Sequence, residues 1–76
     1  MRYLDIIAIG GISFDVHLLS NYAPSIPKSQ QIGKSLGRVE FGSLSPDGQY
    51  EQDDDEVIEF VCNHFDIDSG IPAGVR

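Results

Sequence analysis

The sequence predicts an α+β fold, in which a small antiparallel sheet of three to four strands, made of two hairpins, carries one C-terminal amphipathic helix on one face. Three patterns lead to this prediction: β-prone runs on both sides of Gly10 and Gly11, a second pair of runs around residues 45–48, and a helical apolar repeat in residues 53–65. With 76 residues, the chain has room for a single domain, which we expect to span residues 1–76. Because 41% of the residues are hydrophobic, the chain is too apolar for wholesale disorder.

A first hairpin is predicted over residues 3–19, because glycine adopts the positive φ of a tight turn at little cost. Pairing Ile9 with Ile12 across the two glycines places an apolar set on the core face of the sheet, with Asp5 as its polar exception. This set comprises Tyr3, Ile7, Ile9, Ile12, Phe14, Val16 and Leu18. The opposite, partly wet face comprises Leu4, Ile6, Ala8, Ser13, Asp15, His17 and Leu19. The alternative interpretation is one long strand that is kinked by a glycine bulge.

Residues 20–36 are predicted to form a loop, because they are rich in proline, serine and glutamine and show no apolar period. The loop is either a contact loop or an arm laid across the sheet. A second hairpin is predicted over residues 37–52, with Pro46 and Gly48 in a type I turn and Gly42 weakening the first arm.

The best-specified element is a helix over residues 53–65, where apolar side chains recur at i, i+3, i+4, i+7 and i+8. Asp53 and Glu56 match a capping box, and the acidic residues of the first turn suit the positive end of the helix dipole. The tail over residues 66–76 contains a glycine and a proline that limit the helix, and we expect it to form a coil or a short edge strand. The buried helical stripe would comprise Val57, Phe60, Val61, His64 and Phe65.

Charge is distributed unevenly along the chain, which has a net charge of −7. Residues 1–46 hold four basic residues against three acidic ones, which is +1, whereas residues 47–76 hold nine acidic residues against Arg76 alone, which is −8. Direct binding to a nucleic-acid backbone is not expected, since such binding rests on Lys and Arg. An acidic face instead favours a basic protein surface as the partner.

No catalytic or cofactor motif is complete in the sequence. Gly33, Lys34 and Ser35 lack the first glycine of a phosphate-binding loop, and the residues from Asp66 to Gly70 match a calcium loop only at its start. With Cys62 as the single cysteine and two histidines, the chain also lacks the ligands of a zinc site and a Cys/His nucleophile pair. We therefore expect no enzyme activity, no metal and no cofactor. A small hydrolase or metal-dependent enzyme is the alternative, for which Asp15, His17 and His64 are the residues to examine.

The stretch from Asp5 to Asp15, Asp-Ile-Ile-Ala-Ile-Gly-Gly-Ile-Ser-Phe-Asp, resembles the opening strand of the ribokinase-type sugar kinases. In that family, glycines after the first strand precede an aspartate that contacts the sugar, and the resemblance gives that place to Asp15. The family's distal glycine-rich anion hole with its catalytic aspartate is absent from the sequence. The resemblance therefore does not carry the kinase activity with it.

The sequence favours a small, acidic, non-enzymatic binding protein that docks an acidic face on a basic protein which handles nucleic acid. Phage-encoded inhibitors, including DNA mimics and anti-CRISPR proteins, have a similar size and acidity, which is an analogy of physical type. The alternative is an accessory subunit that contacts a larger assembly, or a second copy of itself, through a sheet edge or the loop. The lone cysteine predicts a cytoplasmic location, and no segment reaches the roughly 20 apolar residues of a membrane span. The predicted partner-binding residues are Glu51, Asp54, Asp55, Glu59, Asp66 and Asp68.

Overall fold

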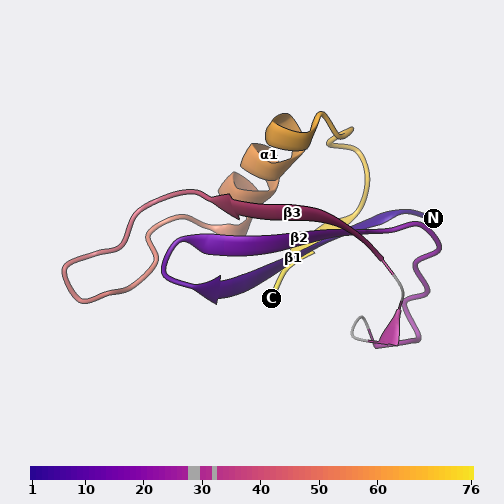
Figure 1. The fold of residues 1–76 in the computed structure, drawn as a ribbon, viewed down its shortest axis with the longest axis horizontal. Coiled ribbons are helices and arrows are strands. Elements are labelled where there is room, and N and C mark those ends of the chain that lie inside the picture. Colours follow the sequence, from indigo (N-terminus) through magenta and orange to yellow (C-terminus); the bar gives the residue numbers. More distant parts are fainter. Residues whose placement is uncertain (28–29, 32) are drawn as a thin grey trace.

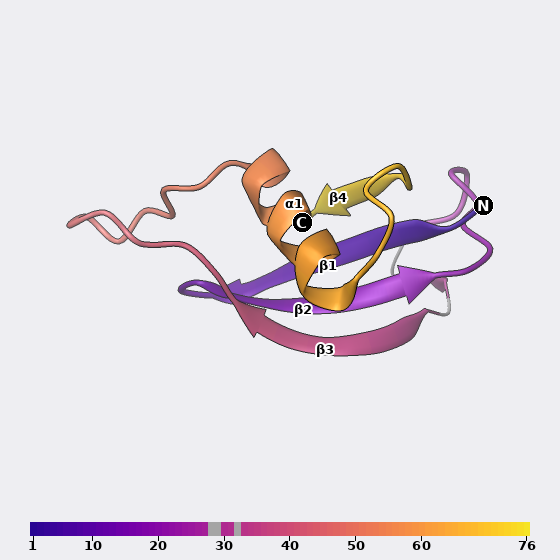
Figure 2. The ribbon, with the colours of Figure 1, turned by 90° about the horizontal axis from the view of Figure 1, so that it is seen from above.

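The computed structural model describes residues 1–27, 30, 31 and 33–76, and it confirms the α+β fold. Strands β1 (Tyr3–Gly10), β2 (Ser13–Leu19) and β3 (Lys34–Glu40) are followed by helix α1 (Asp54–Phe65) and strand β4 (Ala73–Val75). The strand order is β3-β2-β1-β4, and α1 lies across one face of the sheet (Figures 1 and 2). Because β4 runs parallel to β1, the sheet is mixed and not wholly antiparallel as predicted.

The register of β1 against β2 differs from the predicted pairing of Ile9 with Ile12. Gly10 lies opposite Ser13, and the register shifts between Ala8 and Gly10, so that Ile9 is the extra residue of a β-bulge. The predicted hairpin is therefore confirmed, and the alternative of one long kinked strand is wrong. The strands form a hairpin, and a bulge lies beside its turn.

The predicted face assignment of β1 is wrong, because a shift of one residue turns every side chain of a strand to the other face. Leu4 and Ile6 are fully buried on the face that α1 covers, whereas Ile7 is half-buried on the opposite face and Ile9 is 40% exposed. The assignment of β2 to the core side is right for Phe14 and Val16, which belong to the core cluster. The core comprises Leu4, Ile6, Phe14, Val16, Val39, Val57, Val61 and Cys62.

The second hairpin is formed only around its turn, where its two arms pair as predicted. The start of the first arm belongs to β3 and pairs with β2, whereas Leu44 at the end of that arm forms an antiparallel bridge with Tyr50 of the second arm. The turn is confirmed, since the Gly48 N–H donates to the Ser45 carbonyl oxygen over 2.9 Å. Between β3 and α1 the chain thus forms a long loop that reaches beyond the sheet (Figure 1).

The loop predicted over residues 20–36 is shorter than expected, because its last residues belong to β3, which begins at Lys34. Residues 28, 29 and 32 of this loop lie outside the described residues. Near its start, the Tyr22 ring stacks on Tyr3 with the ring centroids 4.3 Å apart, which leaves Tyr3 only 8% exposed. This part of the loop therefore lies against the sheet, as expected for an arm.

Helix α1 begins and ends within one residue of its predicted bounds. Asp53 is the N-cap, and its Oδ1 accepts a hydrogen bond from the Glu56 N–H over 2.9 Å. In the described part of the chain, the Glu56 carboxylate does not return the bond to Asp53, so the capping box is half formed. At the other end, Asp66 adopts a left-handed conformation with φ of 54°, and its N–H donates to the Cys62 carbonyl oxygen.

The buried stripe of α1 is rotated relative to the prediction. Val57 and Val61 are buried as predicted, and Cys62 is buried beside them. His64, which was expected on the stripe, is exposed, and its ring packs between those of Phe60 and Phe65. The sheet therefore contacts a face that includes the thiol, while the imidazole lies at the solvent edge.

Replacing Asp53 with Ala is expected to lower the free energy of unfolding by about 1 kcal/mol, because the Glu56 N–H loses its acceptor. Urea denaturation followed by circular dichroism measures the change. Asp54→Ala is the matched control, since its exposed carboxylate makes no hydrogen bond within the described residues and should contribute less. Equal losses in the two variants would contradict the assignment of Asp53 as the cap.

Candidate protein-binding surface

Helix α1 carries four exposed carboxylates. Asp54, Asp55 and Glu56 occupy the first turn, and Glu59 follows one turn later. Within residues 1–27, 30, 31 and 33–76, none of these four side chains forms an ion pair with Lys or Arg. Their negative charge therefore faces solvent without internal compensation.

Two of the predicted partner-binding residues line one open cavity beside α1. Asp55 and Glu59 are one helical turn apart and line this cavity together with Cys62 and Ser69. Asp68, next to Ser69, is close enough that its charge acts on the buried thiol. Burial, together with the negative charge of Asp68, raises the pKa of Cys62.

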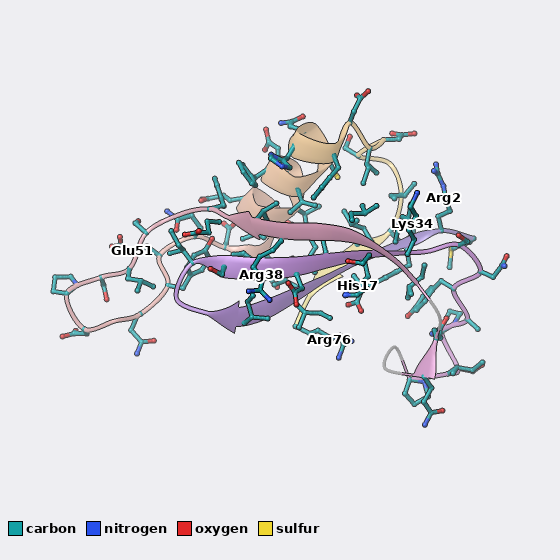
Figure 3. All side chains as sticks on the ribbon, viewed as in Figure 1. Arg2, His17, Lys34, Arg38, Glu51 and Arg76 are labelled. Carbon is teal, nitrogen blue, oxygen red and sulfur yellow. The ribbon has the colours of Figure 1, made fainter. Side chains whose placement is uncertain are left out.

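The remaining predicted residues are spread more widely. Asp66 is exposed at the C-terminal end of α1, whereas Asp54 lies at the N-terminal end. Glu51 lies in the loop before the helix (Figure 3), where its Oε1 accepts a hydrogen bond from the Ser43 hydroxyl over 2.8 Å. The six residues therefore extend from the loop before α1, along the helix, to the segment after it, and Glu51 is already hydrogen-bonded within the loop.

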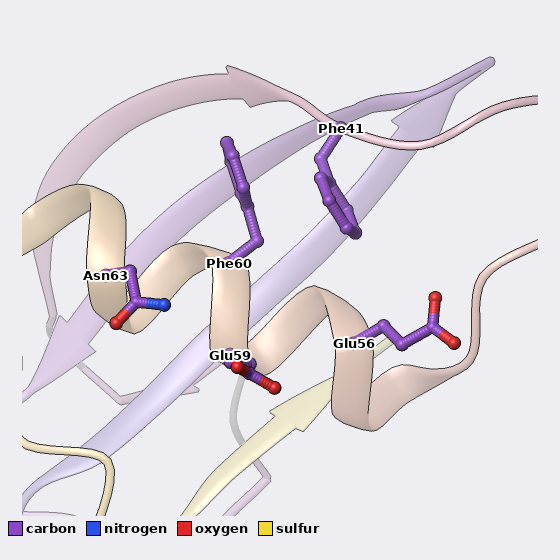
Figure 4. Close-up of a pocket in the computed structure, with 5 residues that line it drawn as sticks. All are labelled: Phe41, Glu56, Glu59, Phe60 and Asn63. Carbon is purple, nitrogen blue, oxygen red and sulfur yellow. The ribbon is translucent and has the colours of Figure 1, made fainter.

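A second cavity, of about 290 Å³, lies on the side of α1 that faces the end of β3 (Figure 4). Its aromatic wall is made by Phe41 and Phe60, whose rings stack with centroids 4.5 Å apart and planes at 18°. Glu56, Glu59 and Asn63 form the helical part of the lining. We refer to these five residues as the aromatic-acidic cavity.

Sequence reasoning missed this cavity, although part of its signal is present in the sequence. Glu56, Glu59, Phe60 and Asn63 occupy i, i+3, i+4 and i+7, which is one stripe of a helix. Glu56 is predicted to cap the helix and Phe60 to join the core, and in the structure Glu56 is exposed while Phe60 packs against the core and stays half-buried. The contribution of Phe41 depends on tertiary packing and leaves no local pattern.

The position of Phe41 is fixed by its backbone. Its N–H donates to the Ile12 carbonyl oxygen over 3.0 Å, and its carbonyl oxygen accepts from the Tyr50 hydroxyl over 2.7 Å. Gly42 allows the second contact, since a Cβ there would lie 2.6 Å from the Tyr50 Oη, and its φ is +99°. Burial, with the nearby charge of Glu56, raises the pKa of Tyr50.

The face of the sheet opposite α1 holds two ion pairs. Arg38 Nε lies 3.0 Å from Asp15 Oδ1, and Arg76 Nε lies 3.1 Å from Asp5 Oδ1. The two arginines are labelled in Figure 3. Arg76 also donates from Nη2 to Asp5 Oδ2, and its hydrogen bonding to the carboxylate raises the pKa of the guanidinium. Asp5 and Asp15 are thus matched by cations, unlike the carboxylates of α1 within the described residues.

The residues considered for the enzymatic alternative do not form one site. Asp15 and His17 point to the face opposite α1, where Asp15 is paired with Arg38, while His64 lies on α1 itself. Across the described residues, no group of three His, Cys, Asp or Glu side chains has an arrangement that could hold a metal ion.

No protein-family model matches this chain, and no curated protein or solved structure shows a significant similarity to it. The described part of the chain also has no helix with the length and apolar character needed to cross a bilayer. The site itself therefore provides the grounds for a functional proposal.

Proposed function

We propose that this chain is a small non-enzymatic protein-binding domain, which docks the outer face of α1 on a basic surface of a protein that handles nucleic acid. The single observation that carries the proposal is the separation of charge across the sheet. The described ion pairs, Asp5 with Arg76 and Asp15 with Arg38, lie on the face opposite α1. The carboxylates of α1 have no such partner within the described residues.

The unpaired carboxylates give the helix face a partner preference. A negative surface steers a positive one toward it and repels other acidic surfaces, which sets both the association rate and the selectivity. Large basic surfaces on proteins are typical of nucleic-acid binding, because Lys and Arg there displace counterions from phosphates. A partner of that class offers the positive charge that the carboxylates of α1 lack. When this chain is bound to the basic surface of the partner, it would compete with nucleic acid for that surface.

The proposal is tested by affinity capture from the lysate of the source organism with three forms of the chain. The first is the wild type, the second carries Asp55→Lys and Glu59→Lys, and the third carries Glu40→Lys and Asp47→Lys as a control. Both variants change the net charge equally, but Glu40 and Asp47 are exposed outside α1. Circular dichroism verifies that all three are folded.

We expect the wild type and the control to retain the same basic protein, and the α1 variant to lose it. The reversal should weaken binding by about tenfold or more, since like charges would then face each other. Release of the partner by salt is expected as well, because surface charges are screened at high ionic strength. Equal retention by the two variants, or retention that salt does not affect, would contradict the proposal.

A second candidate function rests on β3, which has β2 as its neighbour on one side and forms an edge of the sheet. An accessory module of a larger assembly would bind there by strand addition. Lys34 and Arg38 lie on this strand, and the register shift between Val16 and His17 marks an irregularity in its pairing, both of which discourage strand addition. The observations therefore favour α1 over β3 as the docking element.

A further inference from the structure

We infer that the aromatic-acidic cavity receives an arginine side chain of the basic partner. The inference rests on the proposed function, which makes the partner basic, and adds the residue type that anchors it. The cavity consists of Phe41, Glu56, Glu59, Phe60 and Asn63 (Figure 4).

The aromatic wall suits a flat cationic group. Phe41 and Phe60 stack on each other at 18°, and Phe60 also stacks on His64. Both phenylalanines are only half-buried, so part of the pair remains accessible to a ligand. A guanidinium placed against an aromatic ring is attracted by the ring quadrupole and also buries apolar area. The stack thus provides the apolar half of an arginine site.

The polar lining supplies acceptors that are free in this structure. Among the described residues, the carboxylates of Glu56 and Glu59 and the side-chain amide of Asn63 make no hydrogen bond or ion pair with other side chains or the backbone. Each of the three offers an oxygen acceptor, and a guanidinium has five N–H donors. Nothing in the lining is cationic, so the arrangement repels an anion.

Arginine fits this lining better than the other side chains a partner could insert. An apolar side chain would take water from two carboxylates without replacing their hydrogen bonds, which is unfavourable. The lysine ammonium is compact and strongly hydrated, whereas the guanidinium is planar, more weakly hydrated and able to stack and to bind a carboxylate with two N–H groups. The combination of a stacked wall and two carboxylates therefore selects arginine.

The cavity is also held in place before binding. Phe41 is fixed through both its N–H and its carbonyl oxygen, by Ile12 and Tyr50 respectively. The other lining residues project from α1, a regular helix with a capped N-terminus. A site on rigid elements loses less conformational entropy when a ligand binds.

The test is a titration of the labelled protein with hexa-arginine and, separately, with hexa-lysine, followed by nuclear magnetic resonance. The probes are the aromatic signals of Phe41 and Phe60 and the side-chain amide of Asn63. We expect hexa-arginine to shift these signals and to bind about two- to fivefold more tightly than hexa-lysine, the range for an exposed cation–π contact. Glu56→Gln should weaken the binding of hexa-arginine. Phe60→Leu should make the affinities for hexa-arginine and hexa-lysine equal.

Asp54→Asn is the matched control for Glu56→Gln, because it removes one exposed charge from the same helical turn but lies outside the cavity. Equal binding of the two peptides without a shift at Asn63 would overturn the arginine site and leave the proposed docking face standing. Binding of neither peptide would also overturn the inference, while the capture experiment would still decide the proposed function. Should Phe60→Leu fail to fold, the comparison of Glu56→Gln with Asp54→Asn remains decisive, since both positions are exposed.

Discussion

Ile6→Ala is expected to lower the free energy of unfolding by about 2 to 4 kcal/mol, and Ile9→Ala by less than about 1 kcal/mol. The two residues lie on the same strand, but Ile6 is 0% exposed in the core and Ile9 is 40% exposed in the bulge. Removing the Ile6 side chain leaves a cavity among packed neighbours, whereas solvent already reaches Ile9. Urea denaturation of both variants and the wild type measures the difference.

This pair of variants separates the observed register from the one that the sequence predicts. A direct pairing of Ile9 with Ile12 would bury Ile9 and place Ile6 on the wetter face, so the larger loss would then fall on Ile9. If Ile6→Ala does not fold in so small a domain, Ile6→Val should still cost about 0.5 to 1.5 kcal/mol. Losses that are equal, or larger at Ile9, would refute the bulge and the core built on it.

Arg76→Leu is expected to destabilise the fold by about 2 kcal/mol, because it leaves the Asp5 carboxylate without its cation. The Asp5 side chain is 4% exposed and accepts two hydrogen bonds from the guanidinium. A fully buried pair would give a larger effect, but the Arg76 side chain is 42% exposed and solvent screens part of the interaction. The loss is measured by urea denaturation.

Arg38→Leu provides the matched control. Its ion pair with Asp15 has a similar length of 3.0 Å, but the two side chains are 66% and 35% exposed. We therefore expect a loss below about 1 kcal/mol. Replacing Asp5 and Arg76 together with leucine should recover part of the loss caused by Arg76→Leu, since no buried charge then remains unpaired. Equal losses for the two single arginine variants would show that burial of Asp5 has no energetic role.

Helix α1 could be predicted from the sequence because its signals are local. Asp53 caps the backbone three residues ahead, and Val57 and Val61 repeat with the helical period. The turn that ends at Gly48 is encoded within four residues in the same way. Such patterns need no knowledge of the rest of the chain.

The register of β1 could not be predicted, because both of its faces carry large apolar residues. Leu4 and Ile6 alternate with Tyr3 and Ile7, so hydrophobic patterning does not distinguish a sheet face from its opposite. The choice is made by the bulge at Ile9, which depends on how the two glycines shape the turn. The pairing of β3 with β2 is likewise a contact between distant segments.

The charge of the candidate binding surface could be predicted from the sequence, but its shape could not. Asp55 and Glu59 were placed on the exposed face because the apolar residues of α1 must face inward, and both are exposed in the structure. The stacking of Phe41 on Phe60 joins the end of β3 to the helix and appears only when the chain is folded. Local periodicity therefore predicts which acids are exposed, and packing decides which of them surround a cavity.

The central claim, that the outer face of α1 docks on a basic protein, is tested most directly by the affinity of the captured partner. Isothermal titration calorimetry at a series of salt concentrations would compare the wild type with the variant carrying Asp55→Lys and Glu59→Lys. We predict that the wild-type affinity falls steeply as salt rises and that the variant binds about tenfold or more weakly at low salt. An affinity that is equal for both forms and does not depend on salt would contradict the account.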